Sequence, residues 1–323
     1  MTKPIHAIYG YIPRDLADVA SGSVQTSPLV PGSAALTDLA PGCCARFVLH
    51  APASTIERRH VMALALRALS PGAPLTVLAA KDKGGTRLAG ELESFGCTAA
   101  DTHKRHHRIL VTACPDAPIG IAAAIEAGAP RLLPDLKIWS QPGLFNWDRI
   151  DPGSQLLLDH LPQLSGRGAD LGCGLGVLAM AVCAGGACRE MTLIDLDSRA
   201  LAVAERNVWG FGAKTLWTDV RSSNQLPTGL DFVVTNPPFH DGGEEDRALG
   251  QAFIQKAAAM LRPGGVLWLT ANRHLPYEAT LVPLFASVEQ VAQAKGFKIY
   301  CARKETMAAK TAARKPLPKK VRQ

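Results

Sequence analysis

The apolar residues 232–235 (Phe-Val-Val-Thr) are followed at once by Asn236, Pro237 and Pro238. Such a run is typical of a short buried strand. Two successive prolines end it, because proline has no N–H group and its ring fixes φ at about −65°. The strand therefore stops with Asn236 at its tip. In an open α/β sheet ligands bind beyond the carboxyl ends of the strands, so we expect this amide and the Phe239 ring in a binding site.

The chemistry of this corner suits a planar amino group. The side-chain oxygen of Asn236 and the carbonyl of Pro237 can accept both of its hydrogens, and the Phe239 ring can stack on the ring that carries it. The pattern favours transfer of a group to an exocyclic or amide nitrogen. Taken alone, it equally fits a turn in which Asn236 only caps the loop.

A glycine-rich segment supplies a ligand for this corner. Residues 170–176 read Asp-Leu-Gly-Cys-Gly-Leu-Gly and continue into an apolar helical pattern over 177–182. Glycines at alternate positions let the backbone approach a ligand closely, with a helix N-terminus behind them. A strand over 191–195 ends in Asp195, about 20 residues after the loop, which is the spacing of a carboxylate that binds ribose hydroxyls. The pattern predicts a nucleoside ligand.

An acid at the start of the loop indicates which nucleoside. Asp170 would repel a pyrophosphate, which disfavours a dinucleotide oxidoreductase, and would attract a cation such as the amino group or sulfonium of S-adenosylmethionine. A third acid, Asp219, follows the strand-like residues 215–218, where an adenine edge could be read.

Five segments carry a closer resemblance, namely residues 151–158, 170–176, 236–242, 275–277 and 297–300. On these the chain is similar to the class I S-adenosylmethionine-dependent methyltransferases, and among them to the bacterial ribosomal RNA guanine-N2 methyltransferases (RsmC/RlmG type). The resemblance covers roughly residues 143–303. It departs at Arg167, Gly168 and Ala169, where the family usually has bulkier apolar residues, which weakens the propensity of the first strand.

The motifs and the resemblance together give a set of expected site residues. Asn236, Pro237 and Phe239 are expected to be catalytic, and Phe239, His240 and Asp241 to contact the substrate base. Asp241 would hold the other guanine edge or accept a proton late. The segment before the domain is expected to cross the methionine end of the cofactor through Gly153 and Ser154. The expected cofactor-binding residues are Gly153, Ser154, Asp170, Gly172, Cys173, Gly174, Gly176, Asp195, Leu196, Asp219, Val220 and Asn236.

The first half of the chain parallels the second. Residues 69–81 match 261–273 at an offset of 192, residues 108–111 match 298–301 at 190, and residues 47–54 match 232–239 at 185. At the last offset Ala51 stands for Asn236 and Ser54 for Phe239, and residues 5–42 contain no alternating-glycine turn. The sequence thus predicts an α/β protein of two Rossmann-like methyltransferase domains that arose by duplication. We expect a mixed seven-stranded sheet in the C-terminal domain, and a shortened, degenerate N-terminal copy without a cofactor site. In the family such a domain assists folding or RNA binding.

Charge helps to place the domains. The 35 basic and 28 acidic residues give a net charge of +7. Residues 303–323 hold eight basic residues and one acid, which is also +7, so the remainder is formally neutral. We expect a degenerate domain over 1–130, a linker over 131–142, a catalytic domain over 143–302 and a disordered basic tail over 303–323. The tail would bind phosphates or only solubilise the chain.

Composition sets the cellular context. No stretch is apolar enough to span a membrane, and the N-terminus lacks a signal-peptide core, which predicts a soluble cytoplasmic protein. The eight cysteines show no zinc spacing, so reduced thiols and no metal are expected. The basic residues 102–108 could contact RNA phosphates. We expect a monomer.

The function predicted from these observations is S-adenosylmethionine-dependent methylation of the exocyclic N2 of a guanine in ribosomal RNA, with the small subunit favoured. The partner would be ribosomal RNA or a ribosomal subunit. Two alternatives stay open. One is a nitrogen methyltransferase acting on adenine N6 or a protein glutamine amide, and the other is a non-catalytic RNA-binding or assembly protein.

Overall fold

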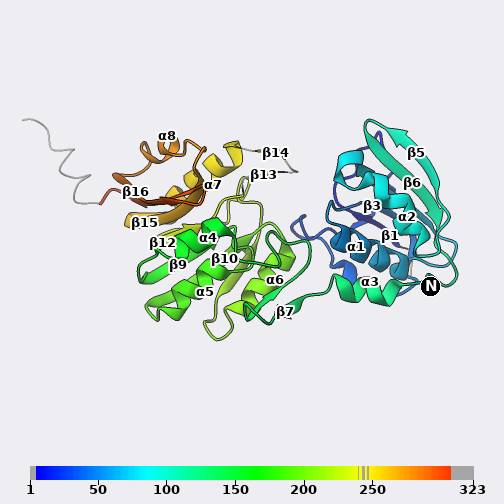
Figure 1. The fold of residues 1–323 in the computed structure, drawn as a ribbon, viewed down its shortest axis with the longest axis horizontal. Helices are drawn as coiled ribbons and strands as arrows, with labels where there is room; N and C mark the ends of the chain where they lie inside the picture. The colour runs from blue at the N-terminus through cyan, green and yellow to red at the C-terminus, as the bar shows by residue number, and fades with distance from the viewer. Residues whose placement is uncertain (1–4, 239, 242–243, 246, 307–323) are drawn as a thin grey trace, which may run out of the picture. The chain divides into compact units, whose positions relative to one another are not determined.

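The computed structural model describes residues 5–238, 240–241, 244–245 and 247–306, and the chain divides into two compact units (Figure 1). The first comprises Met1–Asp148 with Asp197–Arg199, and the second comprises Arg149–Leu196 with Ala200–Gln323. The range 131–142, expected as a linker, contains a two-stranded antiparallel hairpin and clusters with the first unit.

The first unit is built on a six-stranded sheet of order β2-β1-β3-β4-β6-β5. Its strands are β1 (Ile5–Tyr9), β2 (Val24–Gln25), β3 (Cys44–His50), β4 (Pro74–Ala80), β5 (Ala100–Lys104) and β6 (His107–Ala113), and the hairpin is β7 (Arg131–Leu133) with β8 (Ile138–Ser140). Its helices are α1 (Thr55–Ala68), α2 (Leu88–Glu93) and α3 (Ile121–Ala127), with short 3-10 turns η1 (Leu36–Asp38), η2 (Lys81–Lys83) and η3 (Gly85–Arg87).

The main core of the first unit lies on one face of this sheet. Helix α1 contributes a buried row from Val61 to Leu66, which packs with alternate strand residues such as Phe47, Leu49 and Leu75. The opposite face carries only a small cluster of Ile12, Leu16, Val48, Leu78 and Ile109, to which no helix in the described part of the unit contributes. The first unit is therefore a sheet covered by helices on one side.

The second unit has a seven-stranded sheet of order β11-β10-β9-β12-β15-β17-β16. Its strands are β9 (Gly166–Leu171), β10 (Cys188–Asp195), β11 (Lys214–Trp217), β12 (Leu230–Thr235), β15 (Leu261–Asn272), β16 (Ser287–Ala294) and β17 (Phe297–Arg303), with a separate hairpin of β13 (His240–Asp241) and β14 (Glu244–Glu245). Its helices are α4 (Pro152–Leu158), α5 (Val177–Ala184), α6 (Ser198–Asn207), α7 (Arg247–Met260) and α8 (Glu278–Leu281).

Helices cover both faces of the second sheet. Because successive side chains of a strand point to opposite faces, Val233 packs with α7 and α8, while Phe232 and Val234 pack with α4, α5 and α6. Strand β17 runs in the opposite direction to the other six strands, which confirms the predicted mixed seven-stranded sheet. The order of the strands reverses between β9 and β12, and in α/β sheets ligands bind beyond the strand ends at such a reversal.

Packing against the neighbouring strand explains the glycine at position 168 of β9. A Cβ atom at this position would lie 2.0 Å from Cε2 of Phe232 on the neighbouring strand. The aromatic ring occupies the space that a bulkier residue would take, so the glycine is required by packing despite its low strand propensity.

The two sheets share one topology. The order β2-β1-β3-β4-β6-β5 corresponds strand by strand, and in direction, to β10-β9-β12-β15-β17-β16, and β11 has no counterpart. Helices α1 and α7 both have 14 residues and start 192 residues apart, at Thr55 and Arg247. The second unit has seven more residues between β12 and α7 than the first has between β3 and α1, and this stretch contains β13 and β14.

Strand register corrects one of the sequence matches. Phe47 pairs with Leu75 as Val233 pairs with Leu267, and the bridge between Cys44 and Leu69 matches the pair Leu230–Leu261. The true offset of β3 is therefore 186 and not 185. The wrong offset came from matching two aromatic residues, Phe47 and Phe232. These residues face opposite sides of their sheets, because a shift of one residue along a strand moves every side chain to the other face.

The corrected register names the counterparts of the expected site residues. His50, and not Ala51, stands at the position of Asn236. Through the pairing of β1 with β3 and β2, Ile8 stands for Asp170, and Ser27 stands for Asp195. The first unit thus lacks both acids and the amide.

The first residues of the predicted basic tail are part of the folded second unit. Of the predicted basic tail, Arg303 is the last residue of β17, and Lys304 donates through Nζ to the carbonyls of Ala258 and Leu261 at 2.6 and 2.8 Å. Residues 307–323 lie outside the described residues. Among the described helices, none combines the length and the apolar character needed to cross a membrane.

Candidate active site

The glycine loop joins β9 to α5 at the carboxyl edge of the sheet. Gly172, Gly174 and Gly176 have φ values of 73°, 51° and 76°, a region that residues other than glycine rarely adopt. The amides of Gly172 and Cys173 donate to the carbonyl of Ile194 at 2.8 and 3.0 Å, which ties the loop to β10. Gly176 is the N-cap of α5, so this helix begins directly after the loop.

Asp170 is a buried acid at the start of this loop. Its side chain is 1% exposed, and its Oδ2 accepts a hydrogen bond from the amide of Ala179 in α5 at 3.0 Å. The Oδ1 atom is also buried and accepts no hydrogen bond from the described residues. Burial raises the pKa of Asp170 to about 8, with a smaller contribution from the nearby charge of Asp195. A cationic ligand here would supply the missing partner and favour the carboxylate.

Asp195 and Asp219 follow the neighbouring strands. Asp195 ends β10, and its Oδ2 accepts a hydrogen bond from the amide of Gly174 at 2.9 Å, so this acid is fixed directly beside the glycine loop. Asp219 lies after β11 and forms an ion pair with Arg221 at 2.9 Å. The hydrogen bonds from Arg221 hold the pKa of Asp219 below its usual value. Both acids therefore stand at the edge where the sequence predicted them.

Asn236 lies immediately after β12. The preceding residue, Thr235, is fully buried and donates its hydroxyl to the carbonyl of Leu171 at 2.6 Å, which locks the end of β12 to the end of β9. The Nδ2 group of Asn236 donates to Asp151 Oδ2 and to Ser154 Oγ, both at 2.9 Å. Its Oδ1 atom is buried and accepts no hydrogen bond from the described residues. The amide thus presents an unused acceptor.

Asp151 and Ser154 come from the start of α4. Asp151 is the N-cap of this helix, and its Oδ2 accepts from the amide of Ser154 at 3.0 Å as well as from Asn236. Between them, Gly153 has no room for a side chain, because a Cβ atom would lie 2.7 Å from the Phe297 ring and 3.0 Å from Asp151 Oδ2. The close approach explains a glycine at this position.

The other expected residues have different environments. Cys173 and Val220 are buried, and burial raises the pKa of the Cys173 thiol well above its usual value. The carbonyl of Leu196 accepts from Trp217 Nε1 at 2.7 Å. His240 and Asp241 form β13, and nothing further is described for their side chains. Phe239 lies outside the described residues.

The sequence predictions did not include the bond from Asn236 to Asp151. Asp151 was identified only as part of a resembling segment, although an Asp before Pro-Gly-Ser is a strong N-cap signal. The capping position could have been predicted, but not the second partner of the carboxylate, which lies 85 residues further along the chain.

The geometry fits a cationic nucleoside cofactor together with an amino-bearing substrate. Two buried oxygen atoms have no partners among the described residues: Asp170 Oδ1, in the last two residues of β9, and Asn236 Oδ1, directly after the neighbouring strand β12. Asp195 adds a carboxylate next to the loop. Within the described residues no group of three or more histidine, cysteine, aspartate or glutamate side chains is placed to hold a metal ion, and all eight cysteines are free thiols.

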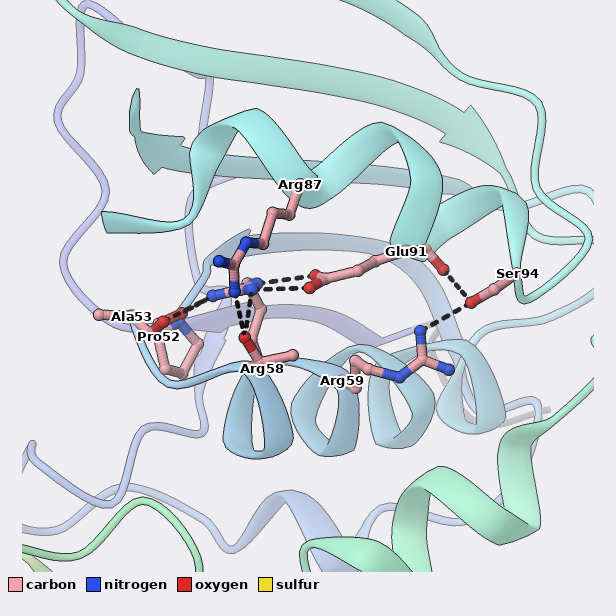
Figure 2. A network of polar contacts seen from close by, with 8 residues as sticks. Pro52, Ala53, Arg58, Arg59, Arg87, Glu91 and Ser94 are labelled. Carbon is pink, nitrogen blue, oxygen red and sulfur yellow. Dashed lines mark hydrogen bonds and ion pairs between the residues drawn. The ribbon is translucent and has the colours of Figure 1, made fainter. Parts of the chain in front are cut away.

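The corresponding corner of the first unit is filled by its own side chains (Figure 2). Arg58 of α1 is completely buried and donates to both carboxylate oxygens of Glu91 at 2.6 and 2.7 Å. It also donates to the carbonyls of Pro52 and Ala53, in the turn that follows β3, at 3.1 and 2.7 Å. A Cβ atom on Gly84 would lie 2.2 Å from the guanidinium, so the loop after β4 closes over it.

The second unit fills the equivalent space in the opposite way. At the offset of 192 that relates α1 to α7, the counterpart of Arg58 is Gly250. A Cβ atom on Gly250 would lie 1.6 Å from the hydroxyl of Tyr277, which follows β15. The large side chain at this place is Arg58 of helix α1 in the first unit, and Tyr277 of the loop after β15 in the second.

Known proteins are similar to this chain in sequence. A family model described as the methyltransferase small domain matches residues 135–301. The ribosomal RNA small subunit methyltransferase C of Shewanella loihica is 33% identical over 266 residues, which cover 80% of this chain and 76% of the relative. The protein of the same name from Pseudomonas paraeruginosa is 31% identical over 290 residues, covering 88% and 87%.

A solved structure extends the comparison to the fold. The 16S rRNA N2 methyltransferase RsmC of T. thermophilus, in complex with AdoMet and guanosine, superposes with a TM-score of 0.76 at 24% identity. The match covers 94% of this chain and 90% of that one, so it includes both units.

Proposed function

The chain belongs to the ribosomal RNA small subunit methyltransferase C family, and from this premise and the geometry of the site we propose that it methylates the exocyclic N2 of a guanine in small-subunit ribosomal RNA. It is an S-adenosylmethionine-dependent methyltransferase. The observation that carries the choice of an amino nitrogen is the buried Asn236 Oδ1, an acceptor without a partner among the described residues, at the end of β12.

Positioning is the main contribution of Asn236. The lone pair of an amino group conjugated with its ring is delocalised, which makes the nitrogen a poor nucleophile. One N–H of the guanine amino group donates to Asn236 Oδ1 and the other to the carbonyl of Pro237, and these two bonds direct the lone pair toward the methyl donor. Orientation of this kind contributes up to about 7 to 11 kcal/mol to a reaction barrier. Phe239 is proposed to stack on the base, and His240 and Asp241 to contact it.

The cofactor supplies a methyl group on a positively charged sulfur. We assign its binding to the residues around the glycine loop. Asp170 would bind its cationic amino acid end, because the Oδ1 atom of this acid is buried without a partner among the described residues. Asp195 would bind the ribose hydroxyls and Asp219 the adenine edge. Gly172, Gly174 and Gly176 would allow close approach of the backbone. Ser154 and Gly153 would lie beside the methionine end, with Cys173, Leu196 and Val220 around the nucleoside.

We assign no cofactor site to the first unit, which we interpret as a shortened duplicate of the second. Three differences support this. Ile8 and Ser27 stand where the second unit has its two acids, His50 stands for Asn236, and the first unit has no stretch corresponding to the hairpin of β13 and β14. A stoichiometry of one S-adenosylmethionine per chain is the expected result.

The first unit is proposed to contribute RNA contacts. The turn between β5 and β6 exposes Lys104 and Arg105, and η2 exposes Lys81 and Lys83. When these cations of the first unit and the basic residues of 303–323 bind RNA phosphates, counterions would be released from the RNA. We further propose that the protein acts in the cytoplasm as a monomer.

Methyl-label transfer tests the proposed function. Purified small-subunit RNA and assembled small subunits from cells that lack this gene are incubated with the protein and methyl-labelled S-adenosylmethionine, and the labelled nucleoside is identified by mass. N2-methylguanosine is expected. Label on N6-methyladenosine or on protein would point to a different acceptor, and no label on any RNA would refute the proposal.

A further inference from the structure

We propose that Asp151 is a positioning residue that fixes which atom of the Asn236 amide faces the substrate, and thereby makes the site selective for an amino group. This inference rests on the proposed function. The starting observation is the pair of hydrogen bonds from Asn236 Nδ2 to Asp151 Oδ2 and Ser154 Oγ, both at 2.9 Å, while Asn236 Oδ1 has no partner among the described residues.

The chemistry of a carboxylate makes this orientation obligatory. An amide has a donor end and an acceptor end of nearly equal size, so packing alone does not distinguish them. An ionised carboxylate only accepts hydrogen bonds. If the amide turned over, its oxygen would face the Asp151 oxygen, and two acceptors would meet in a site where Asp151 is 9% exposed and Ser154 is 6% exposed. Asn236 must therefore direct Nδ2 to Asp151 and Oδ1 to the substrate.

Asp151 is itself held in place. It caps α4, and its Oδ2 accepts from the amide of Ser154 at 3.0 Å. Pro152 follows at the first position of the helix, and Gly153 lies so close that a Cβ atom there would be 3.0 Å from the same oxygen. The oxygen that orients Asn236 is thus fixed by the start of a helix that packs on the sheet.

The consequence is selectivity between chemical groups. An outward Oδ1 accepts from an amino group, whereas an outward Nδ2 would donate to a carbonyl. The bond from Nδ2 to a charged acceptor also polarises the amide and strengthens Oδ1 as an acceptor. Asp151 therefore acts on the substrate through Asn236, without contact of its own.

The variant Asp151→Ser tests this role. Serine caps helices about as well as aspartate, so α4 is retained, but its hydroxyl can donate a hydrogen bond while its oxygen still accepts from the Ser154 amide, and Asn236 can then lie either way round. We expect kcat to fall by about 10- to 100-fold, the effect of a charge-assisted hydrogen bond, with the KM for RNA and the affinity for S-adenosylmethionine nearly unchanged. Asp159→Ser is the matched control, because Asp159 lies at the other end of α4, where its side chain accepts a hydrogen bond from Gln155 at the protein surface.

A binding measurement provides a readout besides activity. Guanosine and inosine differ only in the 2-amino group, and their affinities are measured by ligand-observed NMR. Wild type should prefer guanosine by about 2- to 10-fold, the range of one neutral hydrogen bond, and Asp151→Ser should lose this preference while still binding inosine. If Asp151 had only a structural role, its replacement would weaken the binding of both nucleosides equally.

Full activity of Asp151→Ser, or an equal loss of affinity for guanosine and inosine, would overturn the inference. If wild type labels no RNA, the proposed function fails instead, and the nucleoside preference still tests Asp151.

Discussion

Replacement of Arg58 by methionine should strongly destabilise the first unit. Arg58 is fully buried, and its guanidinium satisfies the Glu91 carboxylate, which is 9% exposed, together with the carbonyls of Pro52 and Ala53. Methionine keeps the apolar stem but leaves these oxygens without their donors. Removal of one partner from a buried ion pair costs about 3 to 5 kcal/mol, and we expect a loss in this range. The double variant with Glu91→Met should be much less destabilised than the single variant, because no unpaired charge remains.

Urea unfolding followed by circular dichroism measures this loss, with the transition of each unit fitted separately. Arg87→Ala is the control, because this exposed arginine donates to the Thr55 hydroxyl at 3.0 Å, as Arg58 does at 3.2 Å, and its replacement should cost less than about 1 kcal/mol. S-adenosylmethionine affinity, measured under native conditions, should stay unchanged in every variant. A loss for Arg58→Met no larger than that for Arg87→Ala would refute the reasoning.

Three further predictions concern the second unit. In the protein without ligand, the pKa of Asp170 is raised from 3.8 to about 8, so between these pH values the folded state keeps a proton that the unfolded state releases. The free energy of unfolding should therefore fall by up to about 1.4 kcal/mol for each unit by which the pH rises across this window. Asp170→Asn should remove that slope in urea titrations at several pH values. Asp195→Ala should weaken S-adenosylmethionine binding at least about tenfold by calorimetry, since it removes a charged acceptor beside Gly174, and unchanged affinity would contradict its ribose role. Gly176→Ala should weaken the same binding, because φ is 76° and a Cβ atom would lie 2.9 Å from the Ala204 side chain; an unaltered affinity together with unaltered stability would show that the loop tolerates a side chain.

The sequence indicated the site well where one physical rule applied. Parallel strands bring their carboxyl ends to one edge, so residues that directly follow apolar runs, such as Asp195 and Asn236, could be placed there before the structure was known. The alternating glycines predicted the loop before α5, and the two prolines predicted the end of β12.

Long-range partners were not predictable from the sequence. The bond between Asp151 and Asn236 joins residues 85 positions apart, and the ion pair of Arg58 and Glu91 joins residues 33 apart. An arginine in a helix is normally exposed, and only the position of α2 over α1 shows why this one is buried. Residue type was also misleading at Phe47, because an aromatic residue does not reveal which face of the sheet it occupies.

Methyl transfer by Asn236→Ala, compared with wild type, tests the central claim most directly. The account predicts that wild type forms N2-methylguanosine in small-subunit ribosomal RNA. Asn236→Ala should lose nearly all of this activity and should bind S-adenosylmethionine with nearly the wild-type affinity by calorimetry. Full activity of Asn236→Ala, or methyl label on an acceptor other than guanine N2, would contradict the account.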